Sequence, residues 1–206
     1  MEPYETLLRS DWAIYRGGSI LLEGSENCRI QDCNFYNLGG NAILFSNYNY
    51  QSSVTGCHLS QIGASGICFV GDPEAVRSPS FRYEESVAIP QIDRITGSKT
   101  ENYPTECLVY DNLIHHIGLY EKQVAGVQLS MCSSITISHN SIYHTPRAGI
   151  NISEGTWGGH IIEYNDVFNT VRETGDHGSL NSWGRDRFWR SNRSQMDSLV
   201  TAEPDI

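Results

Sequence analysis

Short runs of alternating apolar and polar residues recur along this chain, and they return at a regular interval. Each unit reads apolar-x-x-polar-x-apolar-x-x-apolar. Its polar position is asparagine or cysteine, and its last position is threonine in some units. The units begin at Ile30, Val54, Val109, Ile137 and Ile162. Alternation over so few residues, bounded by Gly, Asn or Ser, is typical of β-strands. The pattern therefore predicts one repeated unit of short strands.

A second pattern follows each unit, in which glycine or asparagine leads into a short apolar run. It covers residues 41–45, 66–69, 126–129 and 149–152 and, more weakly, 178–181. Uninterrupted units begin 24 to 28 residues apart. No window has the 3.6-residue period of a helical solenoid, and the leucines are too sparse for a leucine-rich repeat. We therefore predict an all-β fold, a parallel β-helix of about five to six coils that stack at about 4.8 Å.

The polar position of the unit forms one predicted column along the solenoid. Its members are Cys33, Cys57, Asn112, Asn140 and Asn165. An asparagine that faces inward at a corner can bind the coils above and below through its amide. We expect these asparagines to have a structural role and no catalytic role.

The six cysteines could be bridged or free. Cys33 and Cys57 are column neighbours, and Cys28 and Cys107 share a second column, so the coil spacing would permit a bridge in each. We favour free, buried thiols, because cysteine packs as a small apolar group. The cysteine and histidine spacings do not match a zinc site, so no metal ligands are predicted.

The chain of 206 residues, with 39% hydrophobic and 18% charged residues, is interpreted as a single domain. Its repeat is interrupted by an insertion at about 71–106, and an irregular tail follows at about 190–206. The insertion either walls a groove, with Arg77, Arg82, Tyr83 and Tyr103, or forms a solvated loop.

Charge and hydropathy exclude some partners. The formal net charge of −10 argues against nucleic acid, which would require a basic stripe. No apolar run reaches the length of a membrane span, and residues 1–12 lack the basic-then-apolar pattern of a secretion signal. We expect a monomer with no nucleic-acid or membrane partner.

Three turns that precede the apolar runs carry an unusual set of polar residues. Since the turns belong to successive coils, we expect their side chains to lie within about 10 Å along the solenoid axis. The residues are Glu121, Lys122 and Gln123 in the first turn, Arg147 in the second, and Glu173, Asp176 and His177 in the third.

Beside these turns, alternation along the strands directs Gln128 and Asn151 outward. Glu154, Trp157 and Trp183 follow in sequence. The sequence thus predicts a trough with an amide floor, carboxylates at its sides and tryptophans as stacking surfaces. Such a trough suits a polysaccharide, whose hydroxyls bind amides and acids and whose ring faces stack on aromatic rings.

The repeat resembles the right-handed parallel β-helix proteins found among polysaccharide-degrading enzymes. The runs GLYEKQVAGV, HTPRAGINISEGTWGGH and ETGDHGSLNSWGRDRFW resemble β-helical glycoside hydrolases close to glycoside hydrolase family 141, which includes fucosidase and xylanase activities. The resemblance implies a glycoside hydrolase with an extracellular or periplasmic location and no cofactor. It also implies further coils after the GRDRFW region, so that this chain would be a piece of a longer solenoid.

Hydrolysis of a glycosidic bond requires two carboxyl groups. Asp176 is the first candidate, because it lies between glycines beside His177, which could orient it. Asp186 is the second, flanked by Arg185 and Arg187, and Glu173 and Glu154 are reserves. The alternatives are a turn-capping role for Asp176 and a structural ion network around Asp186. The expected substrate-binding residues are His177, Arg147, Lys122, Gln123, Glu154, Trp157, Trp183, Arg185 and Arg187.

Two other functions are consistent with the same residues. The local arginines would suit a uronate-bearing glycan, and a polysaccharide lyase would use Lys122 or Arg147 as a base, with Ca²⁺ as a possible cofactor only in that case. A carbohydrate-binding β-helix without catalysis is the third interpretation. The arginines concerned are Arg147, Arg172, Arg185, Arg187, Arg190 and Arg193.

Overall fold

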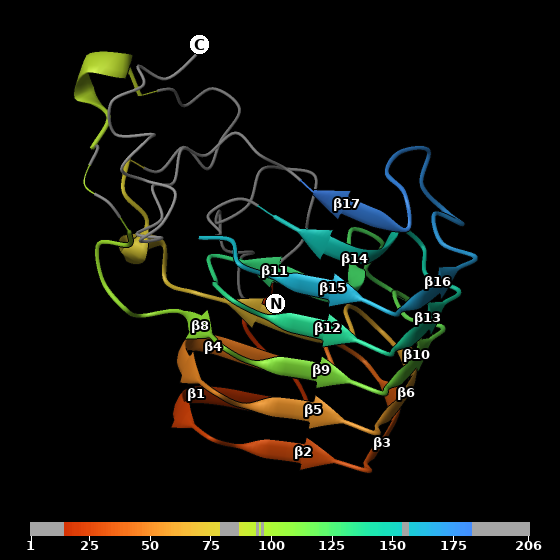
Figure 1. Ribbon diagram of the computed structural model, residues 1–206. Coiled ribbons are helices and arrows are strands. Elements are labelled where there is room, and N and C mark those ends of the chain that lie inside the picture. Colours follow the sequence, from red (N-terminus) through yellow and green to blue (C-terminus); the bar gives the residue numbers. More distant parts are fainter. Residues whose placement is uncertain (1–14, 79–86, 94, 96, 154–156, 183–206) are drawn as a thin grey trace.

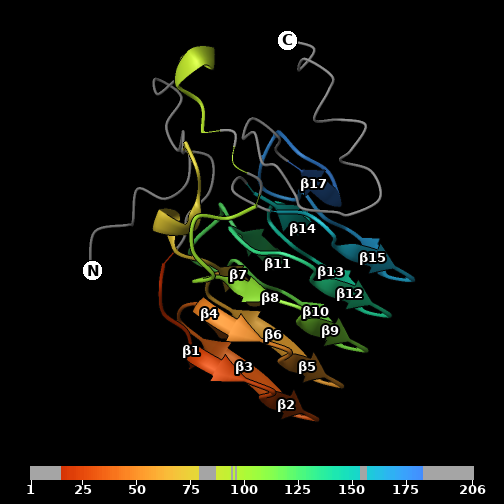
Figure 2. The same ribbon diagram turned by 60° about the vertical axis from the view of Figure 1, so that its left-hand side comes forward.

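The computed structural model describes residues 15–78, 87–93, 95, 97–153 and 157–182. The chain forms a parallel β-helix, as the repeat predicted: three sheets run along the solenoid, and each coil contributes one strand to each sheet (Figure 1). Every strand pair among these residues is parallel. The stacking of coil on coil is also visible from a second direction (Figure 2).

The first sheet contains the strands that begin each coil: β1 (Ile20–Glu26), β4 (Ile43–Tyr50), β7 (Ile67–Val70), β11 (Ala125–Ser130), β14 (Ala148–Ile152) and β17 (Leu180–Ser182). The second contains β2 (Arg29–Gln31), β5 (Ser53–Thr55), β9 (Leu108–Tyr110), β12 (Thr136–Ser138) and β15 (Ile161–Glu163). The third contains β3 (Asn34–Leu38), β6 (His58–Ile62), β10 (Leu113–His115), β13 (Ser141–Tyr143) and β16 (Asp166–Phe168). The described residues therefore make five coils, and β17 begins a sixth.

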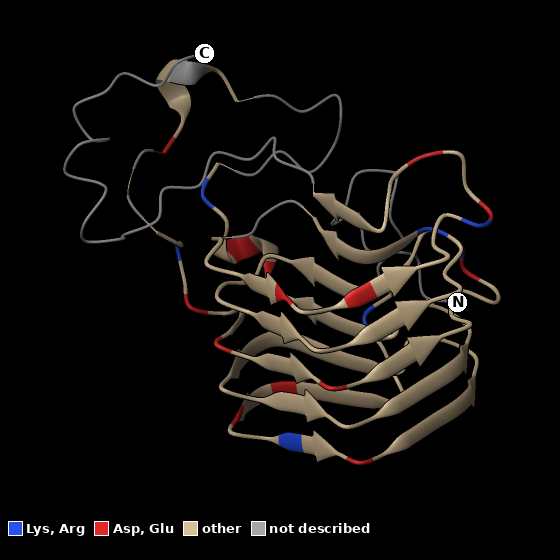
Figure 3. Cartoon of the chain, turned by 45° about the vertical axis from the view of Figure 1, so that its right-hand side comes forward, with Lys and Arg blue, Asp and Glu red and all other residues tan. Residues whose placement is uncertain are grey.

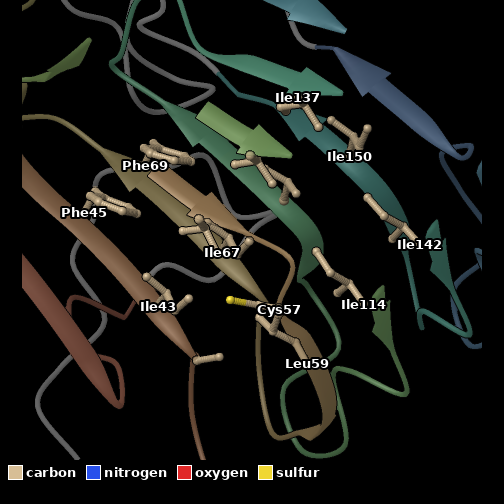
Figure 4. Close-up of a cluster of buried hydrophobic side chains, with 14 of the residues drawn as sticks. Ile43, Phe45, Cys57, Leu59, Ile67, Phe69, Ile114, Ile137, Ile142 and Ile150 are labelled. Carbon is tan, nitrogen blue, oxygen red and sulfur yellow. The ribbon is translucent and has the colours of Figure 1, made fainter. Parts of the chain in front are cut away.

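The core lies inside the coils, where like residues stack in register. Ile43 pairs with Ile67, and Phe45 pairs with Phe69. The two phenylalanine rings stack with centroids 4.6 Å apart, and isoleucines from the other sheets face them across a narrow interior (Figure 4). Burial of these columns supplies the hydrophobic stabilisation that a long, thin solenoid needs.

The predicted asparagine column connects the coils between the second and third sheets. Asn112 donates from its backbone and side-chain nitrogens to Oδ1 of Asn140, at 3.0 and 2.9 Å. Asn140 makes the same two bonds to Oδ1 of Asn165, and the backbone of Cys57 donates to Asn112. The structural interpretation of these asparagines is thus confirmed, since each amide closes a corner that would otherwise bury unpaired polar groups.

All six cysteines are free thiols, as expected, although they are not all buried. Cys33 lies exposed on the first coil, whereas Cys57 and Cys107 are buried. Burial raises the pKa of Cys107 to about 11, so that thiol remains protonated. The expectation that Cys28 and Cys107 are spaced for a bridge was wrong, because Ser52 occupies the coil between them.

Glycine at the start of the first-sheet strand of a coil is required by the stacking of coils. A Cβ added at Gly126 would lie 2.7 Å from the carbonyl oxygen of Gly149, and one added at Gly66 would lie 2.5 Å from that of Gly126. The chain therefore passes closely over itself where each turn enters the first sheet. This close approach determines where the turn residues can lie.

The insertion leaves the coil after β7 and returns through β8 (Pro104–Thr105), which pairs with the end of β4. It contains the 3-10 helices η1 (Pro73–Ala75) and η2 (Ile89–Gln91). Ala75 and Val76 pack on the outer side of the first sheet in a second apolar cluster, together with Leu44, Cys68, Val70, Met131 and Trp157. The insertion thus covers part of that outer face.

Four histidines form a chain of ring contacts on the outer side of the third sheet. Nε2 of His58 lies 2.8 Å from Nε2 of His115, whose Nδ1 lies 2.7 Å from Nδ1 of His116. Nε2 of His116 then lies 3.0 Å from Nδ1 of His144. A neutral imidazole has one donor and one acceptor, so four neutral rings can make this chain without an unpaired contact. One added proton can be accommodated by a shift of tautomers along the four rings, whereas a second would place two donors face to face.

We predict that Asn140→Ala lowers the free energy of unfolding by about 2–3 kcal/mol, because it leaves buried donors of Asn112 without an acceptor. The measurement is urea denaturation followed by circular dichroism. Asn34→Ala, at an exposed position of β3, is the control and should cost about 0.5 kcal/mol or less. Equal losses in the two variants would contradict the role of the column.

The histidine chain predicts acid sensitivity. Burial, followed by the neighbouring histidines, lowers the pKa of His115, and burial, His144 and Arg172 lower that of His116. Protons therefore bind preferentially to the unfolded chain. The stability contributed by these rings is complete above about pH 6.5, which is the histidine pKa in the unfolded chain. It is lost as the pH falls towards the lower pKa that the rings have in the folded protein.

His115→Gln should accordingly make the midpoint of thermal unfolding less sensitive to pH between about 7.5 and about 5.5. His139→Gln removes a histidine that is not among these four contacting rings. It should leave the dependence of the unfolding midpoint on pH as it is in the unmodified protein. An unchanged slope in His115→Gln would refute the assignment.

Candidate functional site

The three turns predicted to converge do stack, at the edge of the solenoid where the chain enters the first sheet. They are residues 116–124 between β10 and β11, 144–147 between β13 and β14, and 169–179 between β16 and β17. The backbone N–H of Val171 donates to the carbonyl of Arg147 at 2.7 Å, and that of Glu173 to the carbonyl of Pro146 at 3.1 Å. These bonds hold the third turn directly on the second. Charged positions of both signs meet on the loops at this corner (Figure 3).

Arg147 is the centre of this turn cluster, which we define as Lys122, Gln123, Arg147, Glu173, Asp176 and His177. Arg147 is 5% exposed; one of its terminal nitrogens bonds the side-chain oxygen of Gln123, and the other lies 2.9 Å from Nε2 of His177. A guanidinium group can only donate. Nε2 of His177 must therefore accept, which places the imidazole proton on Nδ1.

That Nδ1 faces Asp176. It lies 3.6 Å from Oδ2 of the carboxylate, and the backbone N–H of His177 donates to Oδ1 at 2.7 Å. The His177 side chain is 2% exposed and that of Asp176 is 83% exposed. A buried arginine and histidine thus support a carboxylate that reaches solvent, and the connected groups come from three successive coils.

Lys122 and Glu173 form the outer part of the turn cluster. Nζ of Lys122 lies 2.8 Å from Oε2 of Glu173 and donates to the carbonyl of Gly118 at 2.8 Å. The two side chains are 38% and 52% exposed, so the ion pair is partly screened by water. It nevertheless ties the first turn to the third across the second.

The predicted trough requires correction. Gln128 and Asn151 do face away from the core, but both are buried and bond each other, and Asn151 accepts from Asn181. Trp157 is 5% exposed and stacks on Tyr103 with ring centroids 4.1 Å apart. The amides are therefore a closed ladder and Trp157 a packing residue; neither forms an open sugar-stacking surface.

Some predicted residues lie outside the described part of the chain: Glu154, Trp183, Arg185, Asp186 and Arg187. Of the predicted arginine patch, Arg172 is exposed, whereas Arg147 is buried within the turn cluster. Arg147 is therefore not part of a surface patch. Among the described residues, no three His, Cys, Asp or Glu side chains converge to hold a metal ion. No helix in the same ranges is long and apolar enough to cross a membrane.

The structure also contains a cavity that the sequence reasoning missed, at the other end of the first-sheet strands. Its volume is about 410 Å³, and it is lined by Glu26, Tyr48, Tyr50, Glu101, Tyr103, Thr105 and Glu106. Of these lining residues, only Tyr103 belongs to the groove wall predicted from the sequence. The available signal was the density of tyrosine and glutamate around residues 48–50 and 101–106, but the pairing of β8 with β4, which joins these segments, leaves no pattern in the sequence.

Comparisons with known proteins support the fold. No protein-family model matches the chain, and no curated protein matches it. A solved structure described as a glycoside hydrolase superposes with a TM-score of 0.59 and 14% sequence identity, over 84% of this chain and 28% of that one. The chain thus spans under a third of the length of that protein. At this identity, the likeness shows a shared fold.

The contacts in the turn cluster predict that Arg147 contributes much more to the stability of the fold than Lys122 does. Arg147→Ala should lower the free energy of unfolding by about 2–4 kcal/mol, because it removes the buried donor that binds both Gln123 and His177 and so connects three coils. Lys122→Ala should cost about 1 kcal/mol or less, since its partner stays hydrated. Chemical denaturation of both variants measures this, and a larger loss for Lys122→Ala would contradict the central position of Arg147.

Proposed function

We propose that this chain acts on a polysaccharide as a glycoside hydrolase, and that Asp176 provides one of the two carboxyl groups required. The observation that carries the proposal is the linked series Gln123, Arg147, His177 and Asp176. It holds one exposed carboxylate on buried supports, as precise positioning of a catalytic group requires. The fold shared with a solved glycoside hydrolase supports the same choice.

The second carboxyl group is proposed to be Glu173 or Asp186. Glu173 belongs to the same turn as Asp176, and its ion pair with Lys122 is exposed, so a substrate can displace it at small cost. Asp186 lies outside the described residues and stays a prediction from the sequence. One carboxyl group would protonate the leaving oxygen, while the other attacks the sugar or activates water.

The lyase alternative is less well supported by the turn cluster. A lyase would need Lys122 or Arg147 as a base beside the substrate. Arg147 is buried and bonded to Gln123 and His177, and Lys122 is bound to Glu173. Arg147 is therefore occupied with internal partners, whereas Lys122 could act as a base only after a substrate displaces its exposed ion pair with Glu173. Hydrolysis with Asp176, whose carboxylate already reaches solvent, needs no displacement at that residue.

The test begins with a panel of pectic, xylan and fucosylated polysaccharides, in which new reducing ends report hydrolysis. On the substrate that is cleaved fastest, Asp176→Asn should lower kcat by about 10²–10⁴-fold, because the amide cannot exchange a proton. The variant should keep the unfolding midpoint of the unmodified chain, since the Asp176 side chain is exposed.

Asp166→Asn makes the same change at an exposed position of β16 and should retain full activity. Undiminished turnover in Asp176→Asn would remove this residue from the site. Products that carry an unsaturated uronate, detected by ultraviolet absorbance, would instead identify a lyase. Binding of a glycan that is equal in both variants, without products, would identify a non-catalytic binding protein.

A further inference from the structure

The cavity lies at the ends of the first-sheet strands β1 and β4, away from the turn cluster, and its chemistry is different. Three of its seven lining residues are glutamates, three are tyrosines, and none is basic. It is formed where the insertion returns: β8 runs beside the end of β4, so residues 101–106 face Tyr48 and Tyr50. Glu26, at the end of β1, completes the lining.

Hydrogen bonds hold two of the three carboxylates in place. The Tyr48 hydroxyl donates to Oε1 of Glu26 at 2.5 Å, and Gln51 donates to Oε2 of Glu106 at 2.9 Å. Each carboxylate has further lone pairs that these bonds leave available. Tyr103 is fixed by its stacking on Trp157. Four lining residues, Glu26, Tyr48, Tyr103 and Glu106, are therefore held by neighbouring groups.

The potential in the cavity is negative. The hydrogen bond to Glu26, then burial and the charges of Glu26 and Glu101, raise the pKa of Tyr48 to about 12. The hydrogen bond to Glu106, then burial and the charges of Glu106 and Glu26, raise the pKa of Tyr50. Both phenols stay neutral donors, and the carboxylates remain the only charges in the lining. Like charges gathered without a counter-charge repel one another, and a bound cation would relieve that repulsion.

We propose that this cavity binds an organic ammonium group, such as that of an amino sugar. An ammonium group donates charge-assisted hydrogen bonds to carboxylates and is attracted to the faces of tyrosine rings. A neutral sugar would form hydrogen bonds but leave the negative charges uncompensated. A bare metal ion fits less well, because no three acidic side chains converge on one point among the described residues. The site does not depend on the hydrolase proposed above.

Glucosamine and glucose test the proposal, because they differ at one position, where an ammonium group replaces a hydroxyl. Binding is measured by isothermal titration calorimetry at slightly acidic pH and low salt, where the amine is charged. We expect glucosamine to bind at least about tenfold more tightly than glucose, with an affinity that falls as salt is added.

Glu106→Gln should weaken glucosamine binding about tenfold without shifting the unfolding midpoint. Glu163→Gln makes the same change at an exposed position of β15 and should have no effect. The proposal is overturned by equal affinities for the two sugars, by absence of glucosamine binding, or by equal losses in the two variants. Calcium that binds in the absence of sugar, with no binding of glucosamine, would identify a metal site instead.

Discussion

Hydrogen bonding between successive coils is the constraint on which the rest of the structure depends. In the first, second and third sheets, each strand that is not at an end of its sheet pairs with a strand of the coil above and a strand of the coil below. The side chains of Asn112, Asn140 and Asn165 do the same at the corner where no strand runs. A shift of one residue in any coil would move apolar side chains outward and leave these amides unpaired. The register is therefore held by packing and by hydrogen bonds together.

That register also brings distant residues together. Gln123, Arg147 and His177 are separated by 24 and 30 residues in sequence, yet they occupy the same angular position on neighbouring coils. The glycines at 126 and 149 allow the backbones to approach where the turns enter the first sheet. The turns can differ in length and sequence because they bulge outward from a fixed base. Chemistry can thus vary in the turns while the strands preserve the fold.

The sequence predicted those features that repeat. The polar column, the number of coils and the stacking of the three turns all follow from positions that recur with the coil period. It failed where a segment without a repeat packs on the coils. The alternation correctly predicted that Gln128 faces away from the core, but it carries no information on what covers that side. Gln128 and Trp157 were therefore predicted to be exposed, whereas both are buried. The cavity of tyrosines and glutamates was missed for the same reason, because it depends on where the insertion rejoins the sheet.

In the proposed function, coil stacking assembles a glycan site on three turns of the solenoid. The most direct measurement is an NMR titration of the isotopically labelled chain with an oligosaccharide fragment of its preferred polysaccharide. We expect the largest amide shifts in residues 118–124, 145–147 and 171–178, with the three turns responding at one common affinity. Shifts confined to another face, or turns that respond with separate affinities, would contradict it.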